Sequence, residues 1–253
     1  MSIKKHKNIF NNISQKYLSI SDPAYKLKFR HTYEVIKITT LLAKKLSLNS
    51  KEVHIAKLAA LYHDLGRFYQ YGAYKTFHDS QSINHAEASI KIIEEHSILN
   101  DLDKSLKHLI IIAIREHNQK IISNNLNDTE KSFSQLLRDS DKISNFPVFI
   151  KNYDNYIRPI SGIYRNDLID AILNFIPISN VQNNLITVED IYLYHLSWFN
   201  DLTYLASFEY VAEVQYIDKI LIKVSNNKVH ATLSKHFIDL KNGYRFSKKF
   251  GDP

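Results

Sequence analysis

The chain contains no cysteine, which excludes disulfide bonds and thiolate metal ligands. Glycine and proline are also scarce, with 5 of each among 253 residues. A turn-rich β architecture needs more of both, whereas the abundant Leu, Ile, Lys and Ala favour helices. We therefore expect an all-α fold, in which any bound metal is held by nitrogen and oxygen atoms.

Long apolar runs are missing as well. None approaches the roughly 18–20 residues that span a bilayer, and the first residues, 1–7, lead into no apolar segment. We therefore expect a cytoplasmic protein with no membrane partner. The formal net charge of +7 attracts anions, but the lysines are scattered. The charge suits phosphorylated small molecules, and we do not expect a nucleic-acid partner. The sequence indicates no particular oligomeric state.

Helix signals place several histidines. Asp22-Pro23 is typical of an N-cap followed by proline at the first helical position, and predicts a helix to about Leu46. His31 falls on the apolar stripe of this helix, which consists of Leu27, Val35, Ile38, Leu42 and Leu46.

A second predicted helix, capped by Ser50, carries small residues before His63 and is expected to end at Gly66. The aromatic-rich segment 67–81 is expected to be a structured loop. Three further helices are predicted, over about 85–96 with Ser82 as cap, over 103–118, and from 128 or 129 through residues 139 and 141.

Twelve histidines compete for any metal site, and helix geometry limits the choice. His54 and His63 are nine residues apart, about half a turn out of phase, so they cannot share a metal on a straight helix. His108 and His117 are separated in the same way. His85 and His96 share a face but lie about 16 Å apart along the axis. Only one member of each pair can belong to one site.

The run Leu61-Tyr62-His63-Asp64-Leu65-Gly66-Arg67 places an imidazole beside a carboxylate, a compact arrangement for binding a metal ion. Five short segments follow one another along the chain: Phe29-Arg30-His31, His63-Asp64-Leu65-Gly66-Arg67, His85-Ala86-Glu87, Glu116-His117-Asn118 and Asp139-Ser140-Asp141-Lys142. In this order they resemble the pattern H…HD…H…H…D of the HD-domain superfamily of metal-dependent phosphohydrolases. The resemblance covers roughly residues 25–150.

The resemblance implies a set of metal ligands. His31, His63, Asp64 and Asp141 correspond to the four-ligand core, and His85 and His117 to the extra ligands of members with two metals. We therefore expect two divalent ions (Mn, Fe, Mg, Zn, Co or Ni) bridged by Asp64. Asp141 is preferred to Asp139 because the family's aspartate commonly precedes a basic residue, here Lys142.

Four further residues are expected near the metals. Arg67 would hold a substrate phosphate, and Glu87 would orient an imidazole or transfer a proton. Lys142 would assist a leaving group. His78, with Asp79, is expected first to hydrogen-bond within the loop and second to contact substrate.

The expected organisation is a single HD-domain helical bundle with a C-terminal helical extension. Residues 1–24 would form an N-terminal helix or arm, 25–150 the metal-binding core, 151–225 an extension packed on the core, and 226–253 a polar basic tail.

The expected activity is hydrolysis of a phosphomonoester or phosphodiester, with a nucleotide-like substrate attacked by a metal-bridging hydroxide. Two alternatives remain, an HD-type di-iron oxygenase and a non-catalytic module that senses a nucleotide or a partner. The Gly-Tyr-Pro signature of the HD-GYP subgroup is absent.

Overall fold

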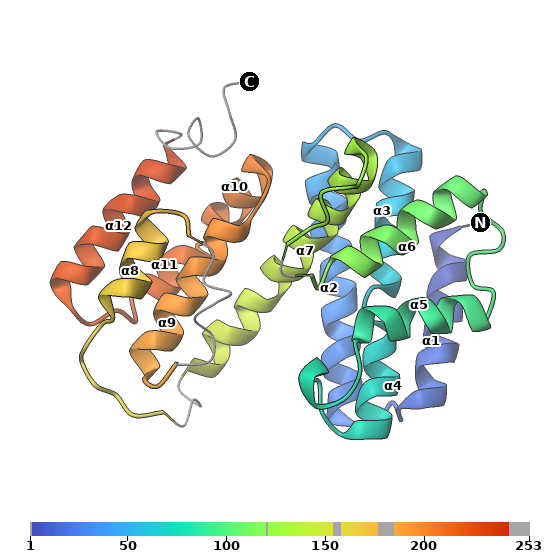
Figure 1. The fold of residues 1–253 in the computed structure, drawn as a ribbon, viewed down its shortest axis with the longest axis horizontal. Helices are drawn as coiled ribbons and strands as arrows, with labels where there is room; N and C mark the ends of the chain where they lie inside the picture. Colours follow the sequence, from blue (N-terminus) through green and yellow to red (C-terminus); the bar gives the residue numbers. More distant parts are fainter. Residues whose placement is uncertain (1, 120, 154–157, 177–184, 243–253) are drawn as a thin grey trace. The chain divides into compact units, whose positions relative to one another are not determined.

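A computed structural model describes residues 2–119, 121–153, 158–176 and 185–242 (Figure 1). Every regular element in these ranges is a helix, which confirms the predicted all-α fold. None of these helices is long and apolar enough to cross a membrane. The chain divides into two compact units, residues 1–144 and 145–253, and the first contains all six expected metal ligands.

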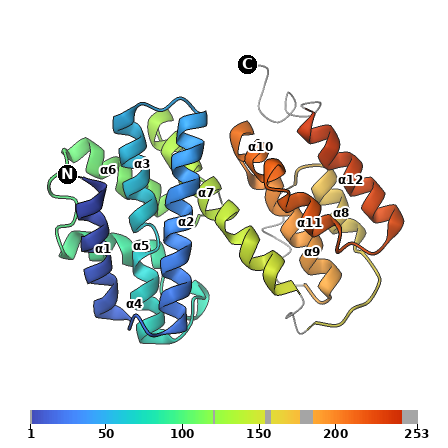
Figure 2. The same cartoon turned by 180° about the vertical axis from the view of Figure 1, so that it is seen from behind.

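The first unit is a helical bundle. Helix α3 packs against α2 and α6, while α4 packs against α1 and α5 (Figures 1 and 2). Leu58, Leu61, Leu65 and Phe68 are fully buried between these helices. The helices are α1 (Ile3–Tyr17), α2 (Pro23–Lys45), α3 (Ser50–Tyr62), α4 (Leu65–Tyr74), α5 (His85–Glu95), α6 (Lys104–Glu116) and α7 (Asp128–Asn152), which continues into the second unit.

Helix starts follow the sequence with two corrections. Asp22 caps α2 by accepting a hydrogen bond from the Ala24 N–H at 2.8 Å, as predicted. Asn49, rather than Ser50, caps α3 through a capping box with Glu52. Asn84, rather than Ser82, caps α5. In both corrections an asparagine side-chain oxygen accepts hydrogen bonds from two free N–H groups of the first turn, which satisfies more of the helix end than one hydroxyl would.

The segment 67–81 is mostly helical and not a loop, because α4 runs to Tyr74 and is followed by a 3₁₀ turn, η1 (Asp79–Gln81). Phe68 and Gln70 of α4 are both fully buried, so packing outweighs the local turn signals. Gly66 therefore does not end a helix. It lies in the first turn of α4, where a Cβ atom would collide with the backbone of His85 and Ser89 on α5.

The predicted apolar stripe of α2 is buried only in the second half of the helix. Val35, Ile38 and Leu42 are buried, whereas Leu27 is 42% exposed. The first half of this face carries Lys28 and His31, whose contacts are polar.

The second unit is also helical. It contains the end of α7, α8 (Asn166–Leu173), α9 (Val188–Ser197), the 3₁₀ helix η5 (Trp198–Asp201), α10 (Leu205–Glu213), α11 (Tyr216–Leu221) and α12 (Asn227–Lys241). Helix α12 occupies much of the segment expected to be a tail. Its residues Leu233, Phe237 and Leu240 are buried, and it packs on α8, α10 and α11. The remainder of that segment, 243–253, lies outside the described residues.

Candidate metal centre

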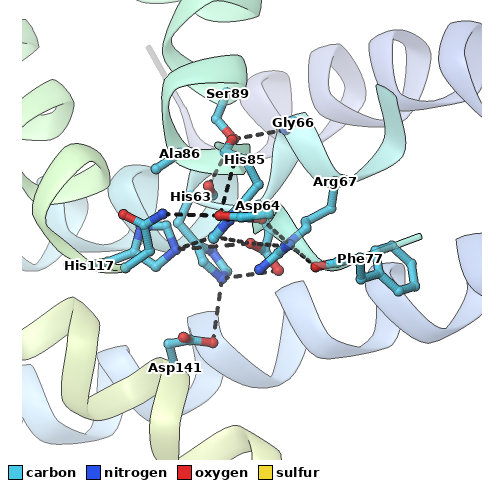
Figure 3. Close-up of polar contacts among 12 residues, drawn as sticks. His63, Asp64, Gly66, Arg67, Phe77, His85, Ala86, Ser89, His117 and Asp141 are labelled. Carbon is cyan, nitrogen blue, oxygen red and sulfur yellow. Dashed lines mark hydrogen bonds and ion pairs between the residues drawn. The ribbon is translucent and has the colours of Figure 1, made fainter. Parts of the chain in front are cut away.

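The six expected ligands come from five separate segments of the chain, and the structure brings them together. His31 lies in α2, His63 and Asp64 join α3 to α4, and His85 begins α5. His117 directly follows α6, and Asp141 lies in α7. Figure 3 shows the Asp64 carboxylate among the imidazoles, with Asp141 reaching toward them from α7.

Asp64 is the centre of this arrangement, because its two carboxylate oxygens face different histidines. Oδ2 lies 3.4 Å from His31 Nε2 and 3.7 Å from His63 Nε2. Oδ1 lies 3.5 Å from His85 Nε2 and 3.9 Å from His117 Nε2. The Asp64 side chain is 4% exposed and makes no hydrogen bond to the N-terminus of α4, which it precedes. Each oxygen of this one buried carboxylate therefore faces a different pair of imidazoles.

The imidazoles within each pair face one another through Nε2. These atoms are 3.4 Å apart in His31 and His63, and 3.1 Å apart in His85 and His117. Asp141 joins the first pair, with Oδ1 at 3.0 Å from His31 Nε2 and 3.8 Å from His63 Nε2. Two nitrogens that each lie about 2.1 Å from one ion are separated by about 3.0–3.4 Å at ordinary bond angles. Both spacings match that requirement.

Main-chain carbonyls orient two of the four rings. His63 Nδ1 lies 2.8 Å from the Ala60 carbonyl, and His117 Nδ1 lies 2.6 Å from the Ile114 carbonyl. Each histidine directly follows its helix, so each ring hydrogen-bonds to one of the carbonyls left free at a helix C-terminus. A carbonyl only accepts, so Nδ1 carries the proton in both rings, and neutral Nε2 presents a lone pair to the centre.

Side chains orient the other two rings. His85 Nδ1 donates to Asp79 Oδ2 at 2.6 Å. His31 Nδ1 lies 3.0 Å from Ser144 Oγ, whose own proton is donated to the Asp141 carbonyl at 2.7 Å. Ser144 therefore accepts from His31, and Nε2 is again the atom directed at the centre. Such partners of the outer nitrogen are typical of metal-binding histidines.

This hydrogen bonding tests whether the residues suit a cation. In neutral His85 and His117 the only ring proton lies on Nδ1, so two lone pairs face one another at 3.1 Å. No hydrogen atom is available to link them, whereas a cation between them would satisfy both. The donors are nitrogen and oxygen only, which suits borderline and hard divalent ions. The residues therefore fit a metal centre.

Burial and charge set the pKa values of the cluster. Burial, reinforced by His85 and His63, lowers the pKa of His117 to about 3. Burial also lowers the pKa of His85, although Asp79 opposes the shift. For Asp64, burial raises the pKa, but Lys28 and His63 outweigh it and hold the pKa well below its usual value. The carboxylates that would bind a cation are therefore ionised at neutral pH.

Among the other predicted site residues, Arg67 directly contacts the shared carboxylate of Asp64. Its Nε is 3.5 Å from Asp64 Oδ1, and its Nη1 donates to Asp79 and Gln70 at 2.8 Å each. Glu87 instead forms an exposed ion pair with Arg115, so Asp79 is the carboxylate that orients His85. The His78 side chain is exposed, and its backbone N–H hydrogen-bonds to Thr76 Oγ1. Lys142 is half-buried beside Asp141, and Asp139 is buried.

Sequence reasoning missed several residues that the structure places around the ligands. Lys28 Nζ contacts Asp64 Oδ2 at 2.8 Å, and Ser144 supports His31. Ser89 accepts from the Gly66 N–H at 2.7 Å and approaches the His63 carbonyl at 2.8 Å. Lys28 and Ser144 lie three residues from His31 and Asp141 on the same helices. That spacing, which places two residues on one helix face, is the signal that identifies them.

Comparison with known proteins agrees with this geometry. The sequence matches the HD domain family over residues 29–155, about half of the chain. The chain therefore belongs to the HD-domain family, whose members are mostly metal-dependent phosphohydrolases. No curated protein and no solved structure shows significant similarity to it.

Proposed function

We propose that this chain is a metal-dependent phosphohydrolase that cleaves a phosphomonoester or phosphodiester, with a nucleotide-like substrate. The supporting observation is the placement of Asp64, whose Oδ2 faces His31 and His63 while Oδ1 faces His85 and His117. This arrangement suits two divalent cations that share one carboxylate.

Each cation would have its own set of ligands. His31, His63 and Asp141 would hold one, and His85 and His117 would hold the other, with Asp64 common to both. Bound there, such ions would activate water near neutral pH and neutralise charge on phosphoryl oxygens. The protein's own contribution is to fix the ligands through Nδ1 and to exclude bulk solvent, since His63 and Asp64 are buried.

Arg67 supplies a fixed positive charge beside this carboxylate. Asp79, Gln70 and the Phe77 carbonyl all accept hydrogen bonds from Nη1, which sets the plane of the guanidinium. A planar cation of this kind suits a phosphoryl group, because it can donate two parallel hydrogen bonds. The net charge of +7 also favours an anionic substrate.

The proposal is tested with protein stripped of metal by a chelator and reloaded singly with Mn²⁺, Mg²⁺, Zn²⁺ or Fe²⁺. Nitrophenolate release from p-nitrophenyl phosphate and bis-p-nitrophenyl phosphate would report the activity, and nucleotides would follow. We expect metal-dependent hydrolysis that Asp64→Asn lowers by more than about 100-fold, since even a residue that only supports a ligand contributes about 10–100-fold.

Asp103→Asn is the matched control, because this exposed carboxylate makes no side-chain cap bond. It should leave hydrolysis unchanged. Oxygen uptake by the iron-loaded protein, without phosphate release from any substrate, would support the oxygenase alternative instead. Retention of activity in Asp64→Asn would contradict the proposed site.

A further inference from the structure

Asp64 contacts two basic side chains, one on each oxygen. Lys28 Nζ lies 2.8 Å from Oδ2, and Arg67 Nε lies 3.5 Å from Oδ1. Lys28 comes from α2 and Arg67 from α4, so the two cations approach from different helices. Lys28 contacts the oxygen that faces His31 and His63, and Arg67 lies near the oxygen that faces His85 and His117.

The two basic groups differ in how many hydrogen bonds they already make. Arg67 Nη1 donates to three acceptors of the protein, which fixes its position. The Lys28 ammonium has three N–H donors, and its single hydrogen bond among the described residues is to Asp64. Two donors of Lys28 are therefore available to a ligand, on a flexible four-carbon stem.

Lys28 and Arg67 both lie next to Phe77. Lys28 Nζ lies 5.2 Å from the centre of the Phe77 ring, and the Phe77 carbonyl accepts from Arg67. Lys28 and Arg67 are 16% and 15% exposed, whereas Asp64 is 4% exposed. Both basic groups therefore retain some access to solvent beside a carboxylate that has almost none.

With two divalent cations bound, the cluster would carry a net positive charge, which favours binding of an anion. Asp64, Asp79 and Asp141 are the acidic groups of the cluster, and Lys28 and Arg67 are its basic groups. Two divalent cations would leave this group of side chains strongly positive. A phosphate dianion would restore the balance, and it would meet one basic side chain on either side of Asp64.

We propose that Lys28 is a binding residue for the anionic group of the substrate, acting across the shared carboxylate from Arg67. The inference rests on the proposed phosphohydrolase function and assigns the phosphoryl group a second cationic contact. Lys28 is then more than a counter-ion that stabilises buried Asp64, because it contributes affinity for the ligand.

The experiment measures binding of inorganic phosphate to Mn²⁺-loaded protein by titration calorimetry, together with the number of Mn²⁺ ions bound. Lys28→Met should raise the phosphate Kd by about tenfold or more, since a hydrogen bond to a charged group contributes roughly that factor. The Mn²⁺ content should stay equal to that of the wild-type protein. Lys28→Arg, which keeps the charge, should restore most of the phosphate affinity.

Lys26→Met is the matched control, because Lys26 is exposed on the same helix and its loss changes the net charge equally. It should leave the phosphate Kd unchanged. An unchanged Kd in Lys28→Met, no phosphate binding by the wild type, or loss of Mn²⁺ from both Lys28 variants would overturn the inference. Lys28-dependent phosphate binding by a protein that hydrolyses no phosphoester would support it while removing the proposed function.

Discussion

At the scale of single residues, the outer ring nitrogens determine what the site can bind. All four histidines use Nδ1 for a hydrogen bond to the protein, through Ala60, Ile114, Asp79 and Ser144. A ring free to rotate would offer either nitrogen, whereas these rings offer only Nε2. Ligand atoms are thus aligned before any ion arrives, which lowers the entropic cost of binding.

Asp79 provides a direct test of this alignment. Asp79→Asn weakens the acceptor for His85 Nδ1 and removes the only charged one of the three acceptors of Arg67 Nη1. We expect affinity for one of two cations to fall by about 10–100-fold while the other is retained. Titration with Mn²⁺ or Co²⁺, read by calorimetry or visible absorption, would separate the two affinities.

Glu87→Gln is the comparison, because Glu87 lies two residues after His85 but pairs with Arg115 at the surface. It should bind both cations as the wild type does. If Glu87→Gln weakened the second cation as much as Asp79→Asn, the orienting role would belong to Glu87, as the sequence alone suggested.

At the scale of helices, two glycines of α4 allow close packing. A Cβ atom on Gly66 would overlap the His85 carbonyl and lie 2.6 Å from the Ser89 nitrogen on α5. A Cβ atom on Gly72 would overlap the Tyr17 carbonyl at the end of α1. Both positions touch rigid backbone, so neither can be relieved by a side-chain movement.

Overpacking usually costs about 1–3 kcal/mol, and overlap with rigid backbone favours the upper part of that range. Alanine improves a helix by roughly 1 kcal/mol, so Gly66→Ala and Gly72→Ala should each destabilise the protein by about 1–2 kcal/mol net. Urea unfolding followed by circular dichroism would measure it. Only Gly66→Ala should also weaken metal binding, because only Gly66 contacts the backbone of His85. Equal metal affinities in the two variants would contradict this difference.

The helices also show what the sequence could predict. The order of the helices before residue 150 and the gathering of His31, His63, His85, His117 and Asp64 followed from periodicity and from a recognisable motif. Helix α4 was not predicted, because its aromatic-rich sequence is typical of a structured loop. Only the structure shows that Phe68 and Gln70 are buried. Contacts between distant residues, such as Lys28 with Asp64, depend on tertiary packing and leave only a weak trace in local spacing.

At the scale of the whole molecule, the fluorescence of a single tryptophan can report the unfolding of the second unit. Trp198 is the only tryptophan of the chain and lies in the second unit, 145–253. There it contacts the ring of His195, which stacks on Phe149 at 4.0 Å between ring centres and lies 2.9 Å from Tyr153 Oη. Burial lowers the pKa of His195 to about 3, so the folded protein holds this imidazole neutral.

Acid should therefore destabilise the second unit. In the unfolded chain His195 takes up a proton below about pH 6.5, whereas the folded state resists it down to about pH 3. The contribution of neutral His195 to the free energy of unfolding is fully present above pH 6.5 and should fall by about 1 kcal/mol for each pH unit below it. Urea unfolding monitored by Trp198 fluorescence at pH 7.5, 6, 5 and 4.5 would show the decline.

His195→Gln should flatten this pH dependence, because glutamine carries no titrating group, even if the variant is less stable at pH 7.5. An equally steep decline in the variant would assign the effect to another group.

The four groups that accept hydrogen bonds from the imidazole Nδ1 atoms differ in how easily a mutation can replace them. His63 and His117 are held by main-chain carbonyls, which no substitution at those positions can remove. His31 and His85 depend on the side chains of Ser144 and Asp79, which a single codon change can replace. Divergence in metal preference among descendants of this chain would therefore enter through Ser144 and Asp79, with every ligand retained.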